Sequence, residues 1–547
     1  MLLGPIGGCP MPSRQASIDP ARLAVFESLA TSIAEEMGAT LRHAALSPNI
    51  KERADYSCAV FDAEGQLLAQ AAHIPVHLGA MPASVSAVAG LAPWAPGDIA
   101  ILNDPFLGGT HLPDVTMVSP VFRTSGRRRR LVGFVASRAH QADIGGMAPG
   151  SMPVAQELVQ EGFIIPPVRL YRAGALVPET LTLFLRNVRT PEERQGDVDA
   201  QVAAQRVGER RLAALADRFG AGGSGRTGFQ AAATALLDSG ERAALAGMAT
   251  IPAGTYRFED FLDDDGTSDE PVPIRLRLTT SARGWELDFT GSAGQRPASI
   301  NAVAAVTRSA SYYVLRCLLP LGAPTNAGLF RPLRFILPER SVVNAAPPVA
   351  VAAGNVETSQ RIVDVVWGAI MQALPGRIPA ASAGTMNNLA AGGTDPRTGS
   401  AWAYYETSGG GLGGGPDGPG LSAVQSHMTN TLNTPAEALE LAYPMRVLEN
   451  SVRRRSGGRG RHRGGDGLVR RTEFLAASTV TLITDRRRLG PWGAAGGEAG
   501  KPGRNRLERA TGTRRTLPGK TTIRVGAGDV IRVETPGGGG WGVAGSG

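Results

Sequence analysis

The chain has 547 residues, of which 42% are hydrophobic and 19% charged, and this length allows about three or four domains. Its formal net charge of +8 is typical of nucleic-acid-binding proteins, but only three of its 56 basic residues are Lys (Lys51, Lys501 and Lys520). This excess of Arg indicates the codon bias of a GC-rich genome, so the charge gives little support to nucleic-acid binding.

The distribution of apolar residues predicts neither a membrane-spanning helix nor a secretory signal. The sequence has no run of about 18 apolar residues, and Met1–Ser17 lacks a basic region followed by an apolar core. We expect residues 1–18 to form a loose tail. Three cysteines without metal-ligand spacing (Cys9, Cys58 and Cys317) indicate neither a disulfide framework nor a zinc finger, and favour a reduced, cytoplasmic setting. Cys58 and Cys317 lie in apolar runs and are predicted to be small core residues.

The first predicted elements are a helix and a hairpin. Asp19 can cap a helix that begins at Pro20, and apolar residues recur with helical spacing over residues 23–41. A hairpin is predicted over Ser57–Phe61 and Gln66–Ala72, with a Gly-containing turn between them.

Two histidines follow this hairpin, His73 and His77. Side chains alternate along an extended chain, so these two would share one face. We assign no role to His73. His77 is a candidate catalytic residue, with a structural role as the alternative.

The greatest concentration of chemically active residues lies between positions 103 and 146. Two copies of His-x-x-Asp, at 111–114 and 140–143, flank two β-branched runs, Val115–Phe122 and Leu131–Ser137. Two such runs around a polar connection with Ser125 and a glycine predict an antiparallel hairpin. Counting outward from its turn places Asp114 opposite residue 139.

This register brings His111, Asp114, His140 and Asp143 to the same end of the hairpin. A carboxylate with two imidazoles suits Zn, Mn or Fe and leaves positions open for water or substrate. The alternative is that each His-x-x-Asp pair is a hydrogen-bonded loop contact without a metal.

The rest of the chain alternates between helical and strand patterns, and the fold class is therefore α+β, a large multi-lobed chain with mixed or antiparallel sheets and packed helices. The best internal boundary by composition is Gly220–Gly228. The remaining elements are predicted at Ile99–Leu102, Pro191–Phe219, Phe229–Ala246, Tyr256–Phe261, Val272–Leu278, Trp285–Phe289, Ala302–Leu319, Leu333–Leu337 and Thr358–Leu374.

Several segments in the C-terminal third resemble phosphate-binding or anion-binding sites, but we do not assign that function to them. Gly519-Lys-Thr521 is not a phosphate-binding loop, because position 514 is Arg where that loop needs Gly. The glycine clusters at 409–415 and 537–540 can bind an anion or allow close chain approach, but are predicted to be mobile surface turns. Arg453–Arg463 is predicted to be a solvated loop rather than a phosphate site.

The segments Asn103–Asp114, Ser137–Gly146 and Pro149–Met152 closely resemble the hydantoinase B family, and the resemblance extends over residues 19–541. The family includes B subunits of ATP-dependent hydantoinases and N-methylhydantoinases, the matching half of 5-oxoprolinase, and the corresponding subunit of acetone carboxylase-type enzymes. The resemblance implies one hydantoinase B-like catalytic region.

The same resemblance implies the metal ligands, which are His111, Asp114 and His140. Many relatives carry a second His where this chain has Gln141, a departure that leaves the three ligands in place. Asp143 would then be a catalytic residue that orients a ligand imidazole, or an alternative ligand to Asp114.

The resemblance implies that the chain is part of an ATP-dependent hydrolase that opens cyclic amides such as hydantoin, N-methylhydantoin or 5-oxoproline. An A-type partner subunit would bind ATP and phosphorylate the carbonyl oxygen, and the metal of this chain would activate the attacking water. A hetero-oligomer is expected, with no nucleic acid, no membrane and no cofactor-binding residues beyond the metal ligands.

Two alternatives remain open. The chain can be a subunit of an ATP-dependent ketone carboxylase of the acetone or acetophenone type, which would need bicarbonate. A non-catalytic scaffold or a nucleic-acid-binding protein is a further alternative, for which a salt-sensitive DNA shift would be the signature.

Overall fold

The computed structural model describes residues 18–545 except residues 72–73, 126–127 and 221–227, and it arranges the described strands in four sheets. One strand pair is parallel and the other pairs within these sheets are antiparallel. The predicted α+β class with mixed sheets and packed helices is therefore confirmed. The tail predicted for residues 1–18 lies outside the described residues, apart from Ile18.

The N-terminal part is built on a seven-stranded sheet with the order β2-β1-β5-β4-β3-β6-β7. Its long central hairpin confirms the prediction for residues 115–137. The strands are β1 (Tyr56–Asp62), β2 (Leu67–Gln70), β3 (Ile99–Leu102), β4 (Asp114–Ser125), β5 (Arg128–His140), β6 (Val168–Arg172) and β7 (Ala175–Leu176).

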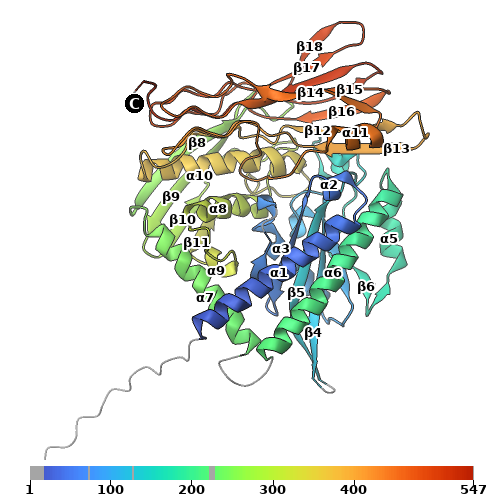
Figure 1. The fold of residues 1–547 in the computed structure, drawn as a ribbon, viewed down its shortest axis with the longest axis vertical. Helices are drawn as coiled ribbons and strands as arrows, with labels where there is room; N and C mark the ends of the chain where they lie inside the picture. Colours follow the sequence, from blue (N-terminus) through green and yellow to red (C-terminus); the bar gives the residue numbers. More distant parts are fainter. Residues whose placement is uncertain (1–17, 72–73, 126–127, 221–227, 546–547) are drawn as a thin grey trace, which may run out of the picture.

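Two long helices, α1 (Pro20–Ala44) and α6 (Pro191–Phe219), cover one face of this sheet, and a third, α7 (Phe229–Met248), lies beside them near the edge strand β2 (Figure 1). Asp19 caps α1 as predicted, because its side chain accepts a hydrogen bond from the Ala21 N–H. The ring of Phe26 meets those of Phe219 and Phe229 edge to face at 5.0 and 5.4 Å. Helices on both sides of residues 221–227 thus share one apolar core.

Short helices connect the strands of this part. His77 ends a 3₁₀ turn, so the prediction of an extended chain around it is wrong, because Pro75 is well suited to the first position of a helical turn. His73 lies outside the described residues. The short helices are α2 (Pro48–Lys51), η1 (Pro75–His77), α3 (Ala80–Val88), η2 (Ala89–Leu91), η3 (Pro105–Leu107), η4 (Pro149–Ser151), α4 (Leu158–Glu161) and α5 (Pro178–Leu185).

The middle of the chain forms a four-stranded sheet, ordered β11-β10-β9-β8, and two helices pack on it; the four strands and the two helices lie where the sequence predicts them. A π-helical turn, η5 (Gly354–Thr358), precedes α10 (Ser359–Ala373). Cys58 is buried as predicted, but Cys317 near the end of α8 is exposed, because the apolar stripe of that helix points the other way. The other elements are β8 (Gly254–Leu262), β9 (Val272–Ser281), β10 (Gly284–Asp288), α8 (Ala304–Leu318), α9 (Ala327–Phe330) and β11 (Leu333–Ile336).

The C-terminal part contributes two further sheets, ordered β13-β12-β16-β19 and β14-β15-β20-β17-β18, which enclose an apolar core of their own. The elements are β12 (Asn388–Thr394), β13 (Ala401–Glu406), α11 (Ala436–Ala442), β14 (Met445–Arg453), β15 (Gly467–Phe474), β16 (Ser478–Ile483), β17 (Arg504–Glu508), β18 (Arg514–Leu517), β19 (Lys520–Val525) and β20 (Val530–Glu534).

The glycine clusters of this part are not surface turns, so that prediction is wrong. Gly537–Gly540 is buried, and a Cβ built on Gly538 would lie 2.0 Å from the Leu412 carbonyl oxygen. Glycine is required there because the backbones of two segments pack directly on one another.

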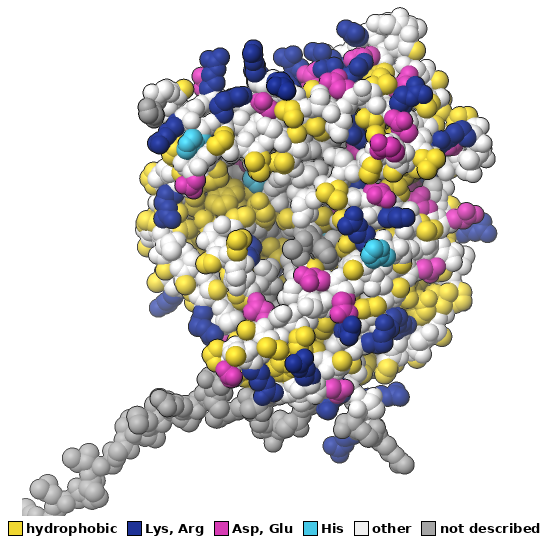
Figure 2. Space-filling model, viewed as in Figure 1, with side chains coloured by type: hydrophobic (Ala, Val, Ile, Leu, Met, Phe, Trp, Pro, Cys, Tyr) yellow, Lys and Arg dark blue, Asp and Glu magenta, His cyan; other side chains and the backbone are white. Residues whose placement is uncertain are grey.

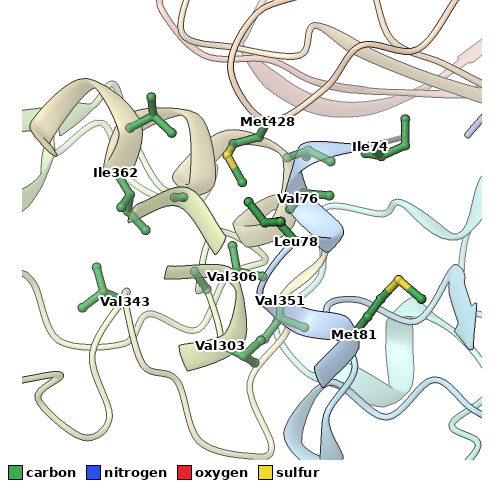
Figure 3. Packing of buried hydrophobic residues seen from close by; sticks show 14 of the residues in the cluster. Ile74, Val76, Leu78, Met81, Val303, Val306, Val343, Val351, Ile362 and Met428 are labelled. Carbon is green, nitrogen blue, oxygen red and sulfur yellow. The ribbon is translucent and has the colours of Figure 1, made fainter. Parts of the chain in front are cut away.

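The three parts meet in one apolar core. Figure 3 shows Val76 from η1, Val306 from α8, Ile362 from α10 and Met428 from the C-terminal part around the same space. The Val76 N–H also donates a hydrogen bond to the Met428 carbonyl at 3.2 Å. The C-terminal part is therefore packed against the segment that delivers His77.

Basic side chains are distributed unevenly over the molecule. Residues 436–547 contain 21 Lys and Arg against 10 Asp and Glu, so this segment carries the whole positive excess of the chain. Figure 2 shows these dark blue side chains along the face formed by the C-terminal sheets. Within the predicted solvated run, Arg454 and Arg455 are exposed.

Candidate metal centre

The hairpin of β4 and β5 begins and ends at two of the predicted ligands. Asp114 pairs with His140, one residue further than predicted, because a β-bulge inserts Val132 where the pairing passes from Val121 to Phe122. Opposed residues of an antiparallel pair project from the same face of a sheet. The carboxylate of Asp114 and the imidazole of His140 therefore leave the hairpin side by side.

His111 reaches them from the loop between η3 and β4. The side chain of Asn103 ties the end of that loop to a neighbouring segment, since its Nδ2 donates to the Leu112 carbonyl at 2.8 Å and its Oδ1 accepts from Ile165 N–H at 2.6 Å. Gly108, with φ +97°, lets the loop turn tightly against α3, where a Cβ would lie 2.6 Å from the Ala83 carbonyl oxygen.

Three side chains converge at this end of the hairpin. His111, Asp114 and His140 each offer one ligand atom, and these atoms all lie within 4.8 Å of one another. The Nε2 of His111 is 3.4 Å from Asp114 Oδ2, and the two imidazole rings meet edge to face at 5.1 Å. None of the three side chains is more than 3% exposed.

The hydrogen-bond inventory of this cluster fits a divalent ion. Both ring nitrogens of His111 and Nε2 of His140 are buried without a hydrogen-bond partner. Buried polar atoms in proteins are normally paired, so unpaired nitrogens facing a carboxylate indicate positions for a ligand. Two imidazoles and one carboxylate suit Zn, Mn or Fe, and the donor set alone does not distinguish among these.

The surroundings keep these groups in the protonation states that bind a cation. Burial by itself would raise the pKa of Asp114, but the charges of His111 and His77, with the hydrogen bond from His77, hold this pKa well below its usual range. Burial, reinforced by the charge of His111, lowers the pKa of His140 well below its usual range. Asp114 is therefore ionised and His140 neutral at physiological pH.

His77 lies directly against the cluster. Its Nε2 is 3.3 Å from Asp114 Oδ2, and its Nδ1 is 2.8 Å from the hydroxyl of Ser57 on β1. The Thr110 hydroxyl donates to the same Asp114 oxygen at 2.5 Å. The structure thus brings His77 to the predicted ligands through a contact that its sequence position did not indicate.

Asp143 is placed differently. One of its oxygens accepts hydrogen bonds from the Gly145 and Arg189 N–H groups at 3.0 Å, and the other accepts from Arg189 Nη1 at 2.9 Å and from the Gly150 N–H at 3.2 Å. These contacts order the loop after β5 and occupy both oxygens. A part for Asp143 in ligand orientation or catalysis stays a prediction.

Three residues near the centre received no role from the sequence. Arg138 is buried on β5, two residues before His140 and therefore on the same face of the strand. Its Nε donates to Thr116 Oγ1 at 2.8 Å, and its Nη1 has no partner. Burial lowers its pKa to about 10. Strand alternation from His140 would have found it. Asn49 and Tyr405 also contact His140. No local pattern could have found them, because they reach it from distant segments.

Lys520, from the Gly-Lys-Thr segment, lies in β19 away from any glycine loop. Its Nζ is 3.1 Å from both Asp264 Oδ1 and Asp485 Oδ2. Lys520 and Asp485 are buried and Asp264 is partly buried, so Lys520 is held in ion pairs that join the C-terminal part to the turn after β8.

Sequence comparisons give the relatives of the chain. The profile of the family described as Hydantoinase B/oxoprolinase matches residues 19–544. An uncharacterized protein of Methanocaldococcus jannaschii is 39% identical over 531 residues, which cover 96% of this chain and 91% of that protein. The 5-oxoprolinase 1 of Arabidopsis thaliana is 37% identical over 552 residues, which cover 96% of this chain but 42% of that protein. The chain thus spans less than half of that oxoprolinase.

Two solved structures share the fold. The ATP-dependent caprolactamase from Pseudomonas jessenii superposes with a TM-score of 0.88 at 29% identity, covering 96% of this chain and 91% of that one. A nucleotide-free acetone carboxylase gives 0.84 at 21% identity, covering 96% and 76%, a likeness of fold alone. Among the described helices, none is long and apolar enough to cross a membrane.

Proposed function

Because the chain belongs to the hydantoinase B/oxoprolinase family, we propose that it is the B-type component of an ATP-dependent hydrolase of cyclic amides. The substrate class is a hydantoin, N-methylhydantoin or 5-oxoproline ring. The names of two similar proteins, 5-oxoprolinase 1 and ATP-dependent caprolactamase, support a lactam as substrate and ATP as the second reactant.

The observation that carries this proposal is the buried cluster of His111, Asp114 and His140 with unpartnered ring nitrogens. An amide carbonyl is a poor electrophile because nitrogen donates electrons into it, and phosphorylation of its oxygen creates a far better leaving group. When bound by these three residues, a divalent ion supplies Lewis-acid chemistry at an oxygen of the reactants.

The neighbouring residues have supporting tasks in this proposal. His77 and Thr110 hold the Asp114 carboxylate in one orientation through its Oδ2. His77 is also the candidate for moving a proton, because its imidazole connects the Ser57 hydroxyl with the cluster. Asp143 orders the loop that follows His140.

The ATP-binding function is assigned to an A-type partner, with which the chain would form a cytoplasmic hetero-oligomer. The chain corresponds to 42% of 5-oxoprolinase 1, which leaves more than half of that protein for other functions. Within this chain the lysine of the Gly-Lys-Thr segment is held in ion pairs with Asp264 and Asp485, so it is not free to bind phosphate.

The test measures metal content and ATP-dependent ring opening of the purified chain, alone and with an A-type subunit. We expect bound divalent metal, and hydrolysis of hydantoin or 5-oxoproline only when both subunits and ATP are present. Protein without bound metal, or ring opening by the A-type subunit alone, would contradict the proposal.

The carboxylase alternative shares the fold, so substrate chemistry must decide it. Incubation with acetone, ATP and labelled bicarbonate would leave label in an acid-stable product if the chain serves a carboxylase. The hydrolase proposal expects no fixed label.

A further inference from the structure

We infer that Tyr405 and Asn49 are positioning residues for His140, Tyr405 on the face of the imidazole and Asn49 at its Nδ1 edge. The inference rests on the proposed metal centre. It adds that two distant segments, α2 and β13, fix the ring plane and the tautomer of one ligand.

The face contact is a parallel stack. The rings of Tyr405 and His140 have their centroids 4.5 Å apart and their planes 8° from parallel. His111 meets the same imidazole edge to face at 5.1 Å. Rotation of the His140 ring about its Cβ–Cγ bond would drive it into these neighbours, so stacking confines its plane.

Tyr405 is itself firmly held at its hydroxyl end. Its hydroxyl donates to Asn388 Oδ1 at 2.7 Å, and Asn388 Nδ2 donates at 2.7 Å both to Glu357 Oε1 and to the Ile483 carbonyl. Glu357 lies in the π-helical turn η5, a feature frequent at functional sites.

The backbone end of Tyr405 is held by a cation. Arg53 Nη1 donates to the Tyr405 carbonyl at 2.9 Å, and its guanidinium carbon lies 5.0 Å from the Tyr405 ring centroid. The stacking ring is therefore anchored at both ends, as a positioning group requires.

The edge contact concerns the tautomer of His140. Its Nδ1 lies 3.2 Å from the amide nitrogen of Asn49, which is buried in α2. An imidazole that ligates through Nε2 carries its proton on Nδ1 and donates it to an acceptor. The Asn49 amide oxygen accepts a hydrogen bond from Arg53 Nη1 at 3.4 Å, and half a turn of the amide exchanges this bond for one that accepts the Nδ1 proton of His140.

Tyr404, next to Tyr405 in β13, provides a matched comparison. Both tyrosines are buried, but Tyr404 points to the opposite face, where its hydroxyl donates to Glu406 at 2.8 Å and its ring packs against Tyr443 at 4.9 Å. Substitution of Tyr404 removes a similar side chain from the same strand without touching His140.

The experiment measures the Zn²⁺ dissociation constant by chelator competition, and the Co²⁺ absorption spectrum, for the wild-type chain and variants. Tyr405→Leu and Asn49→Leu are expected to weaken Zn²⁺ binding about 10- to 100-fold. Both should also alter the Co²⁺ spectrum. Tyr405→Phe keeps the stacking ring and Asn49→Asp keeps an acceptor, so both should bind nearly as well as wild type.

The controls separate positioning from folding. Tyr404→Leu should lose thermal stability as Tyr405→Leu does but keep the wild-type dissociation constant and Co²⁺ spectrum. Equal Zn²⁺ affinity for folded Tyr405→Leu, Asn49→Leu and wild type would overturn the inference while leaving the metal centre intact.

Two other outcomes also test the positioning role of Tyr405 and Asn49. If Tyr405→Leu does not fold, Asn49→Leu takes its place, and an affinity equal to wild type in folded Asn49→Leu overturns the inference. If the wild-type chain binds neither Zn²⁺ nor Co²⁺, the proposed function fails first and the inference falls with it.

Discussion

Two groups of buried charged and polar side chains lie in this protein, and their hydrogen bonding differs. At the junction of α10 with the C-terminal part, three carboxylates meet three cations. Asp260 and Asp364 each lie within 3.2 Å of Arg361 and of Arg486, and Asp485 lies 3.1 Å from Arg361 and from Lys520. At the end of the β4–β5 hairpin, a single carboxylate, that of Asp114, faces the imidazoles of His77 and His111, and both ring nitrogens of His111 and Nε2 of His140 have no hydrogen-bond partner.

The comparison teaches how to separate a structural cluster from a binding site. A buried charge is tolerated when an opposite charge compensates it, and such a cluster needs nothing from outside. Buried nitrogens without partners are costly unless something binds them. Unpartnered atoms occur in both groups, but those of Arg361 and Arg486 are guanidinium Nε atoms, which only donate and cannot ligate a cation. The unpartnered imidazole nitrogens of His111 and His140 can ligate one, and this chemistry makes their cluster the candidate metal centre.

The largest effect is expected from His111→Ala, which removes a ligand from the incomplete cluster. Bound metal should fall from about one ion per chain to none, and ATP-dependent turnover with the partner subunit should disappear with it. Plasma mass spectrometry of the purified protein measures the first effect. His43→Ala, which changes an exposed histidine of α1, is the control. If His111→Ala lost its metal but kept turnover, the cluster of His111 would not be a catalytic metal site and would be structural like the ion-pair cluster.

The next effect is expected from Arg361→Met, which breaks the compensated cluster. Three buried carboxylates would lose a cation, and the free energy of unfolding should fall by about 3–5 kcal/mol. Chemical denaturation measures this change, and metal content per folded chain should stay at the wild-type value. Arg334→Met is the control, because its 3.5 Å pair with Glu286 is exposed and contributes less than about 1 kcal/mol.

A smaller effect concerns Glu357, which stands between the two groups. Burial, followed by the charge of Asp485, raises its pKa from 4.5 to about 8. The folded chain therefore holds a proton that the unfolded chain releases, and the free energy of unfolding should fall as pH rises from about 4.5 to 8. Glu357→Gln should flatten this dependence by up to about 1.4 kcal/mol per pH unit.

Urea denaturation at several pH values measures this slope. Glu498→Gln, at an exposed glutamate, should keep the wild-type dependence. Equal slopes for wild type and Glu357→Gln would mean that Glu357 is ionised in the folded chain.

Local patterns predicted much of the first two thirds of the fold. The helix Pro191–Phe219 and the strand Ile99–Leu102 have the predicted bounds, because spacing and terminal residues define such elements locally. The C-terminal sheets were not predicted. Their glycine-rich segments carry no period, and their structure depends on backbone contacts such as that of Gly538 with Leu412.

The metal centre was partly predictable for the same reason. Asp114 and His140 are the end residues of one hairpin and His111 lies in the loop just before it, so the expected register was wrong by only the single residue of the bulge. The contacts of His140 with Asn49 and Tyr405 depend on how α2 and β13 pack around it. Tertiary packing of this kind leaves no mark in local spacing.

The smallest effect is expected at Gln141, the residue directly after the predicted ligand His140. Its side chain points away from the centre, toward α6, where its Nε2 lies 3.4 Å from Gln201 Oε1. Successive residues of an extended chain project to opposite sides, so a histidine at 141 would not reach the ion beside His140. Gln141→His should therefore leave the metal stoichiometry unchanged. It should change the Zn²⁺ dissociation constant by less than about 10-fold, the smallest effect expected for a residue that orients a ligand. A second equivalent of bound metal in this variant would show that the cluster extends to the α6 side of the hairpin.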